Sequence, residues 1–178
     1  MVEHRSVGNL IAWHNARFAL GSGQRCTSLA GLSFDAVVWE LWPALAAGAG
    51  VDLLPPSCAN DPEALLSWWS ARTLDVSFLP TPLVGTALAL AAPAQRPRVL
   101  LTGGDKLALP PGGTAGAALV NNYGVTEAAV VSCSGPVDPG EGVPHIGRPI
   151  ANTRIYILDA RLSAAPVGVA GELCIAGE

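Results

Sequence analysis

The residues of this sequence whose types and spacing could do chemistry together lie in one short segment, residues 121–127, which is Asn-Asn-Tyr-Gly-Val-Thr-Glu. The ring of Tyr123 can stack on a base, and Gly124 lets the backbone approach a ligand closely. A hydroxyl beside a carboxylate, at Thr126 and Glu127, suits Mg²⁺, which is usually held by one or two carboxylates together with substrate phosphates. The segment therefore suggests a nucleotide site, although a polar turn after a strand would use the same residue types.

Such a site needs an element to hold it, and the sequence offers a strand edge. Residues 117–120 form a short apolar run directly before the segment, so we expect the segment to sit at the carboxyl end of a strand. In open α/β sheets, ligands bind at that edge.

Short apolar runs alternate with amphipathic runs over most of the chain, which predicts an α/β fold with a doubly wound, mostly parallel sheet in a flavodoxin-like subdomain. We expect strands at 27–32, 51–54, 76–79 and 98–102, a first helix capped by Ser6, and helices that begin near Asp35, Asp61 and Thr81. Beyond Cys133 the sequence becomes rich in glycine and proline, and residues 153–158 and 171–175 alternate as β-strands do. We therefore divide the chain into an α/β part, 1–140, and the start of a β-rich subdomain, 141–178.

The composition excludes several classes of protein. Half of the 178 residues are hydrophobic and 13% are charged, which is typical of a packed domain and not of a disordered chain. The net charge is −4, and nine scattered arginines with the single lysine Lys106 form no basic stripe, so we exclude a nucleic-acid partner. The longest apolar runs, such as 87–92, fall short of the roughly 20 residues that span a membrane.

The cysteines and the N-terminus indicate where the protein works. The four cysteines lie too far apart for a metal or disulfide framework, at Cys26, Cys58, Cys133 and Cys174. The first residues are polar and carry no signal sequence. Both features favour a cytoplasmic protein with reduced thiols and no membrane attachment.

Residues 121–127 closely resemble the N-x-Y-G-P-T-E core motif of the adenylate-forming enzymes, specifically the adenylation domains of nonribosomal peptide synthetases. Val125 stands where the motif usually has proline, which alters turn stiffness more than chemistry. Further segments resemble family motifs in the right order. Residues 1–7 resemble the segment after the phosphate loop, and residues 34–40 resemble the F-D-x-S motif, with Val37 in place of serine. Residues 101–105 resemble the G-G-E/D segment, and residues 147–153 and 171–177 complete the series. The chain thus resembles an internal fragment of such a domain.

The resemblance implies how ATP would be bound. Tyr123 should stack on the adenine, with the backbone of Gly103 and Gly104 covering the other face. Asn121 should accept a hydrogen bond from the adenine amino group through its side-chain oxygen, and Gly124 belongs to the same set.

The same resemblance assigns the catalytic roles. Thr126 should contact the α-phosphate region and Glu127 the Mg²⁺. Asn121 and Thr126 could instead satisfy turn backbone, and Glu127 could be a solvated surface carboxylate.

The family pattern also implies an amino-acid pocket. Asp35 should receive the α-ammonium group of the substrate, because a buried cation needs a paired anion. Capping of the following helix is an additional role that Asp35 could serve. The remaining walls should come from Ala36, Trp39, Phe78, Leu101, Gly103, Asn122, Val130 and Val131.

These walls are apolar apart from Asn122, and the set is similar to the family's leucine-type specificity code. We therefore expect a medium, branched aliphatic side chain. Isoleucine, valine and methionine compete, since one methylene discriminates by only about 1–3 kcal/mol. Core packing is the alternative role for Trp39 and Phe78.

By this resemblance, the parent enzyme would form an aminoacyl adenylate from ATP and an amino acid. It would then pass the aminoacyl group to the phosphopantetheine thiol of a carrier protein, in a synthetase with condensation domains. Because the family's phosphate loop, ribose-binding aspartate and catalytic lysine should lie outside residues 1–178, we expect the fragment alone to be inactive. The alternatives are an acyl- or aryl-CoA ligase, whose substrates would leave Asp35 unexplained, and a non-catalytic module that carries specificity.

Overall fold

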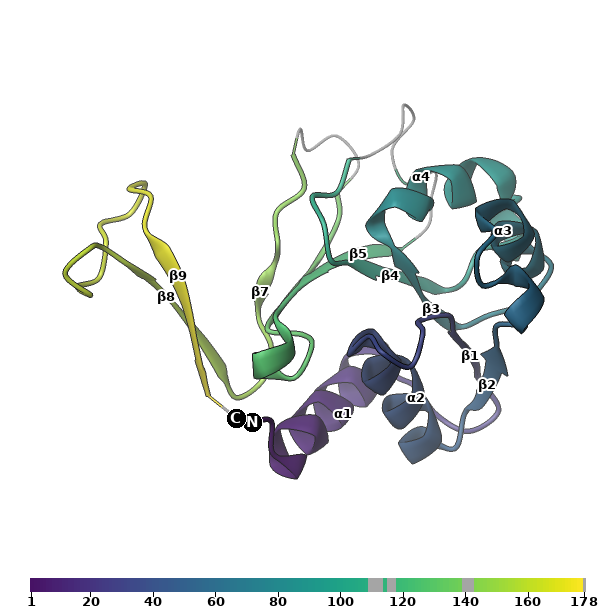
Figure 1. Ribbon diagram of the computed structural model, residues 1–178, viewed down its shortest axis with the longest axis horizontal. Helices are drawn as coiled ribbons and strands as arrows, with labels where there is room; N and C mark the ends of the chain where they lie inside the picture. Colours follow the sequence, from purple (N-terminus) through teal and green to yellow (C-terminus); the bar gives the residue numbers. More distant parts are fainter. Residues whose placement is uncertain (109–113, 115–117, 139–142, 178) are drawn as a thin grey trace.

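The computed structural model describes residues 1–108, 114, 118–138 and 143–177 (Figure 1). In this part of the chain a seven-stranded sheet carries helices on both faces, and a two-stranded sheet projects from one side. The helices are α1 (His4–Phe18), α2 (Ala36–Ala47), α3 (Pro62–Ser70) and α4 (Thr81–Leu90). None of the described helices is long and apolar enough to cross a bilayer.

The larger sheet is mostly parallel, as the sequence predicted. Its order is β2 (Gly50–Leu53), β1 (Arg25–Ser28), β3 (Val76–Pro80), β4 (Val99–Gly103), β5 (Leu119–Tyr123), β6 (Cys133–Pro136) and β7 (Arg148–Pro149). Strands β2 to β5 run parallel, whereas β6 and β7 add antiparallel pairs beside β5. The α/β doubly wound fold is therefore confirmed.

Local sequence explains where several helices begin and end. Asp61 caps α3 by accepting hydrogen bonds at Oδ1 from the amides of Glu63 (2.9 Å) and Ala64 (3.1 Å), with Pro62 in the first turn. Helix α2 ends at Gly48, whose φ of 70° favours glycine. The prediction for Ser6 is wrong, because α1 already begins at His4 and the cap position is Glu3.

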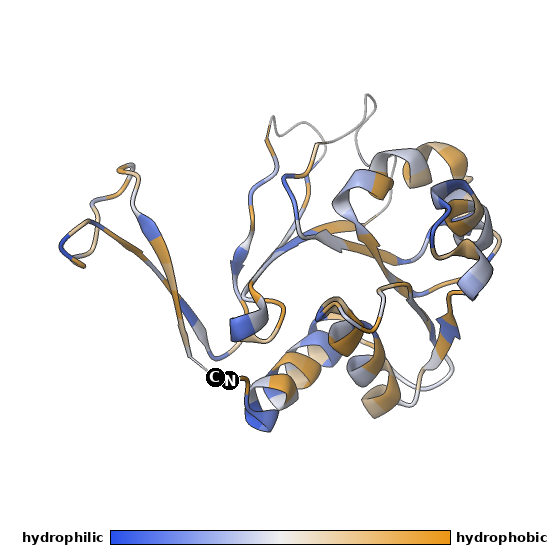
Figure 2. Ribbon diagram, viewed as in Figure 1, coloured by the Kyte–Doolittle hydropathy of each residue, from blue (hydrophilic) through white to orange (hydrophobic). Residues whose placement is uncertain are grey.

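Two hydrophobic clusters hold the helices on the sheet. Hydrophobic residues recur along the central strands and the helices beside them (Figure 2). One cluster joins α3 and α4 to residues such as Leu79 and Leu100. The other joins α1 and α2 to Val76 and Leu101 on the opposite face. Because side chains alternate along a strand, adjacent residues such as Leu100 and Leu101 enter different clusters. The face under α1 and α2 carries several of the residues expected to line the amino-acid pocket.

The second sheet is a hairpin of β8 (Thr153–Leu158) and β9 (Glu172–Gly177), as the alternation predicted. Asn9 of α1 holds the approach to this hairpin, since its Nδ2 donates to the carbonyl of Ala151 and its Oδ1 accepts from Asn152, both at 2.9 Å. The change of sheet falls after β7, which still pairs with β6. The boundary near residue 140 stays a prediction.

Two strand predictions need correction. The expected strand at 27–32 is β1, which begins earlier and ends at Ser28. The strand expected to end before residue 121 continues through Tyr123, so Asn121, Asn122 and Tyr123 lie within β5 and not after it. Residue 117, which we assigned to this strand, lies outside the described residues.

Candidate functional site

The chemistry-bearing segment spans the carboxyl end of β5 and the short 3-10 helix η3 (Thr126–Ala128). Strand β5 pairs in parallel with β4, which places Asn121 beside Thr102 and Asn122 beside Gly103. Strand β4 in turn places Leu101 beside Phe78 of β3. Three strand ends therefore supply part of each of the two sets of residues that the resemblance assigns to ATP and to the amino acid.

The strand separates these two sets by face. Val120 lies in the cluster under α1 and α2, so Asn122 lies on that face, whereas Asn121 and Tyr123 lie on the other. Phe78 and Leu101 also belong to the cluster under α1 and α2. The expected nucleotide residues and the expected amino-acid residues thus occupy opposite faces of one strand end.

The two asparagines are buried and hydrogen-bonded through their amide nitrogens. Asn121 donates from Nδ2 to the carbonyl of His145 (2.9 Å), and its Oδ1 accepts from none of the described residues. Asn122 donates to the carbonyls of Thr102 and Val120, both at 3.0 Å, and its buried Oδ1 is also without a donor in the described part of the chain. Each side chain therefore has one carbonyl oxygen that no donor of the described residues satisfies.

Glycine is required at two positions by close backbone approach. A Cβ on Gly103 would lie 2.5 Å from the carbonyl oxygen of Asn122, and one on Gly124 would lie 2.1 Å from that of Val130. Gly104 has an open surrounding but a φ of +96°, which L side chains rarely adopt. These glycines have a structural role in addition to the nucleotide contacts that the resemblance implies.

A hydrogen bond between Asp35 and Thr126 links the residues expected to bind the amino acid to those expected to bind ATP. The hydroxyl of Thr126 donates to Oδ2 of Asp35 at 2.5 Å. Asp35 occupies the N-cap position of α2, yet its side chain makes no capping hydrogen bond. The expected ammonium-binding carboxylate is therefore directly bonded to a residue expected near the α-phosphate.

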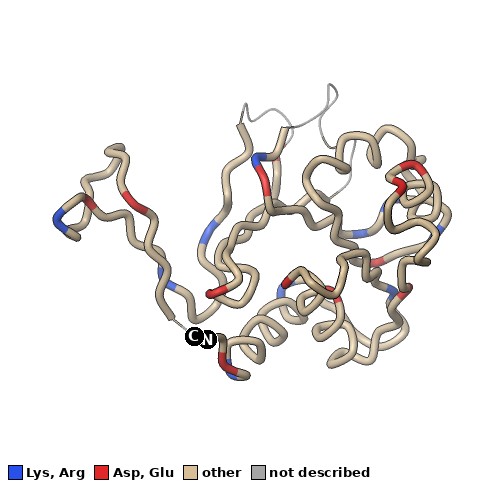
Figure 3. The backbone as a smooth tube through the Cα atoms, in the orientation of Figure 1, with Lys and Arg blue, Asp and Glu red and all other residues tan. Residues whose placement is uncertain are grey.

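Glu127 is exposed on η3 and lines a hollow of ≈ 240 Å³ together with N-terminal residues and the end of β9. No group of three His, Cys, Asp or Glu side chains suited to a metal occurs among the described residues. Charged residues are dispersed along the described part of the chain (Figure 3). A single carboxylate fits Mg²⁺ in the mode in which substrate phosphates supply further oxygens.

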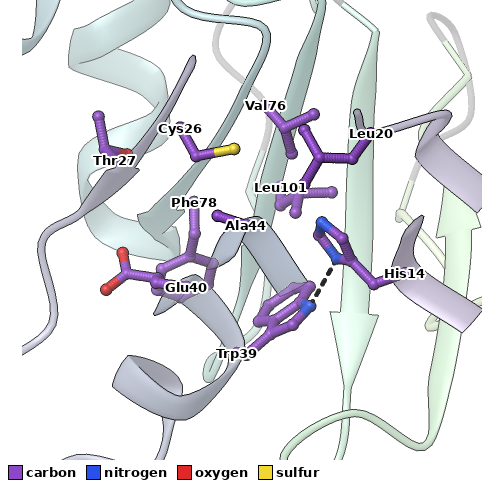
Figure 4. Close-up of a pocket in the computed structure, with 10 residues that line it drawn as sticks. All are labelled: His14, Leu20, Cys26, Thr27, Trp39, Glu40, Ala44, Val76, Phe78 and Leu101. Carbon is purple, nitrogen blue, oxygen red and sulfur yellow. Dashed lines mark hydrogen bonds between the residues drawn. The ribbon is translucent and has the colours of Figure 1, made fainter. Parts of the chain in front are cut away.

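Three expected wall residues, Trp39, Phe78 and Leu101, line a pocket of ≈ 20 Å³ (Figure 4). The rings of Trp39 and Phe78 lie 5.4 Å apart at 57°. Val130 and Val131 pack in the same hydrophobic cluster. The lining of this pocket does not include the remaining members of the set: Asp35, Ala36, Gly103, Asn122, Val130 and Val131.

The lining of this pocket also includes residues that we had not assigned to the site, among them His14 and Glu40. Burial lowers the pKa of His14 to about 4. Burial raises the pKa of Glu40 to about 7, against hydrogen bonds from the amides of Leu29 and Ala30 and the hydroxyl of Ser28 that lower it. The signal for His14 was present in the sequence, since it lies midway between Leu10 and Phe18 at helical spacing.

The turn after η3 is strained, which the sequence did not indicate. Ala129 and Val130 have φ values of 55° and 72°, and the amide of Val131 bonds the carbonyl of Ala129 at 2.9 Å, which makes a γ-turn. A β-branched residue in this region is an outlier, and such strain tends to occur at ligand sites.

Known proteins of one family are similar to this chain over its whole length. A sequence model of the family described as AMP-binding enzyme matches residues 1–178. A linear gramicidin synthase of Brevibacillus parabrevis is 45% identical, over 99% of this chain and 2% of the relative. Bacitracin synthase 1 of Bacillus licheniformis is 43% identical, over 100% of this chain and 3% of the relative. The chain therefore spans a few per cent of the length of these relatives.

Among solved structures, the nonribosomal peptide synthetase FmoA3 superimposes with a TM-score of 0.87 at 29% identity, over 99% of this chain and 20% of that one. Its AMPPNP-bound form gives 0.85 at 31% identity with the same coverage. Its form bound to alpha-methyl-L-serine-AMP gives 0.86 at 28% identity, over 99% of this chain and 22% of that one.

Proposed function

Because this chain belongs to the AMP-binding enzyme family, we propose that it forms the part of an adenylation domain that binds ATP and selects an amino acid. In the reaction, a carboxylate oxygen of the amino acid attacks the α-phosphorus of ATP and pyrophosphate leaves. The complete domain would then transfer the aminoacyl group to the phosphopantetheine thiol of a carrier protein, beside condensation domains of a cytoplasmic synthetase.

The observation that carries the proposal is the hydrogen bond between Thr126 and Asp35. The aminoacyl adenylate has its ammonium group and its phosphate close together, so its site must bring an anion and a phosphate-facing residue close together. The chain does so with residues that are far apart in sequence. The overall similarity to FmoA3 forms that hold AMPPNP and alpha-methyl-L-serine-AMP supports an adenylate-binding role for this chain.

On the nucleotide side, we assign the adenine to Tyr123 and Asn121. Tyr123 lies at the strand end with a partly accessible ring, and the open Oδ1 of Asn121 can accept from the adenine amino group. Gly103 and Gly104 would cover the second face, because no side chain intervenes there. Glu127 would hold Mg²⁺, whose charge offsets the negative charge that develops on the phosphates.

On the amino-acid side, we assign the α-ammonium to Asp35 and the side chain to the apolar walls. Trp39, Phe78 and Leu101 close the deep end of the amino-acid pocket. Two ionisable side chains line it beside them, His14 and Glu40, and neither presents a free charge. His14 is neutral because of its lowered pKa, and Glu40 already accepts backbone hydrogen bonds. This environment favours a leucine-like side chain.

We also propose that residues 1–140 form the α/β subdomain that carries both half-sites, and that residues 141–178 contribute to a β-rich subdomain. The hairpin of β8 and β9, tied to α1 through Asn9, is the described portion of the latter.

The test is Asp35→Ala in the complete adenylation domain that contains this chain, assayed by amino-acid-dependent ATP–pyrophosphate exchange. Loss of the carboxylate leaves the substrate ammonium unpaired, so kcat/KM should fall at least 100-fold, since breaking such a pair costs about 3–5 kcal/mol. Unimpaired exchange would favour the rival assignment, a ligase of acyl or aryl acids that lack the amine.

A further inference from the structure

His14 and Trp39 form a buried, hydrogen-bonded pair at the deep end of the proposed amino-acid pocket (Figure 4). The indole Nε1–H of Trp39 donates to Nδ1 of His14 at 2.9 Å, and each side chain is 3% exposed. The two residues come from α1 and α2, so the bond joins the two helices that cover this face of the sheet.

The imidazole of His14 is well placed to act as a fixed hydrogen-bond acceptor. To accept at Nδ1 it must be neutral, with its proton on Nε2, and its burial favours the neutral form. Its ring is held edge-on by Phe18, with centroids 4.9 Å apart, and by Trp13 at 6.3 Å. The position of the acceptor is therefore set by α1 itself.

The indole of Trp39 lines the pocket together with the imidazole of His14. There the ring of Trp39 meets that of Phe78, and the space that remains beside them is ≈ 20 Å³, about enough for one water molecule. Small side chains, Cys26 and Ala44, form another part of the lining. A modest shift of the indole would consequently change the volume available to a substrate side chain by a large fraction.

We propose that His14 is a positioning residue for amino-acid selection: by accepting the indole hydrogen bond, it fixes the ring of Trp39 and thereby the depth of the pocket. The inference rests on the proposed function, because it concerns which amino acid that pocket accepts. His14 touches no substrate atom in this account and acts through Trp39.

A second buried indole in the chain provides a matched control. Trp69 donates from Nε1 to the hydroxyl of Ser77, also at 2.9 Å, but it lies in the cluster under α3 and α4, on the opposite face. Removing that indole donor with Trp69→Phe leaves the hydrogen bond of Ser77 with Thr27 in place, and should lower stability without altering which amino acid is selected.

The experiment compares ATP–pyrophosphate exchange with leucine, methionine and phenylalanine in the complete adenylation domain. His14→Leu removes the acceptor while keeping a similar volume. It should raise the KM for leucine and lower the preference for leucine over the larger substrates by about tenfold, as expected for loss of one buried hydrogen bond, with the KM for ATP unchanged. His14→Asn, whose side-chain oxygen can take the place of Nδ1, should restore the preference to within about threefold.

Trp39→Phe removes the indole donor from the other side and gives a second route if His14→Leu does not fold. In the Trp39→Phe background, His14→Asn should change the preference no further, because the partner of the hydrogen bond is already gone. An unchanged preference in both His14→Leu and Trp39→Phe, with leucine still activated, would overturn this role alone. A domain that activates no amino acid would overturn the proposed function together with this role.

Discussion

The hydroxyl of Thr126 bonds the carboxylate of Asp35 at 2.5 Å, although the two residues lie 91 positions apart in the sequence. Asp35 is half-buried at the start of α2, and Thr126 is exposed on η3 after β5. The hydrogen bond therefore joins the start of α2 to the end of β5, the strand that carries the proposed nucleotide residues. We infer that it aligns the ammonium and phosphate parts of a single bound adenylate.

Removing the hydroxyl of Thr126 should slow the reaction more than it weakens the binding of ATP or of the amino acid. For Thr126→Val in the complete domain, we expect kcat/KM for the amino acid to fall by about 10- to 100-fold, since hydrogen bonds to charged groups contribute about 1.5–3 kcal/mol. Thr126→Ser keeps the hydroxyl and should stay within about threefold of the wild type. Equal activity of the valine and serine variants in the exchange assay would argue against this role.

Close backbone packing predicts a large difference between two Gly→Ala substitutions. Gly124→Ala places a Cβ 2.1 Å from the Val130 carbonyl, and moving that strained turn should cost at least about 1–3 kcal/mol of unfolding free energy. Gly8→Ala lies on the exposed side of α1 with nothing within 4 Å, and should stabilise by about 0.5–1 kcal/mol. Urea unfolding of the two variants measures both effects, and equal midpoints would contradict the packing described.

The two buried ionisable groups at the pocket should give opposite pH dependences of stability. Because the pKa of His14 is lowered to about 4 by burial, its contribution is present above pH 6.5 and is lost as the pH falls toward 4. Because the pKa of Glu40 is raised to about 7 by burial, its contribution is present below pH 4.5 and is lost as the pH rises toward 7. Each contribution is roughly 3 kcal/mol, so they largely cancel between these limits.

Single variants should separate the two contributions. In Glu40→Gln only His14 remains, so the free energy of unfolding should rise as the pH increases from 4 to 6.5. In His14→Leu only Glu40 remains, so the free energy of unfolding should fall as the pH increases from 4.5 to 7. Denaturant unfolding across this range checks both slopes, and parallel profiles in the two variants would contradict the assignments.

Features encoded within a few residues were predictable from the sequence. The Asp61-Pro62 start of α3 and the bounds of β8 follow from capping and from alternation, and the alternation of short strand and helix patterns indicated the fold class. The cap at Ser6 failed because α1 begins one turn earlier. The extent of β5 was missed because Asn121 and Asn122 are polar, and only their hydrogen bonds to other segments make a buried strand position favourable.

Features that depend on distant segments were not predictable. The bond between Asp35 and Thr126 requires the packing of α2 against the end of β5, which no local pattern describes. The γ-turn at Val130 is held by its surroundings against the preference of a β-branched residue. His14 carried a helical-spacing signal for burial, but its role as an acceptor depends on a tryptophan on another helix.

The central claim is that Asp35 recognises the α-ammonium of an aliphatic amino acid in a site that forms an adenylate. The most direct test compares leucine with isocaproate, which has the same side chain and carboxylate but no α-amine, in ATP–pyrophosphate exchange by the complete domain. We expect leucine-dependent exchange and at least about 100-fold lower kcat/KM for isocaproate, because Asp35 would be left unpaired. Equal exchange with the two acids would contradict it.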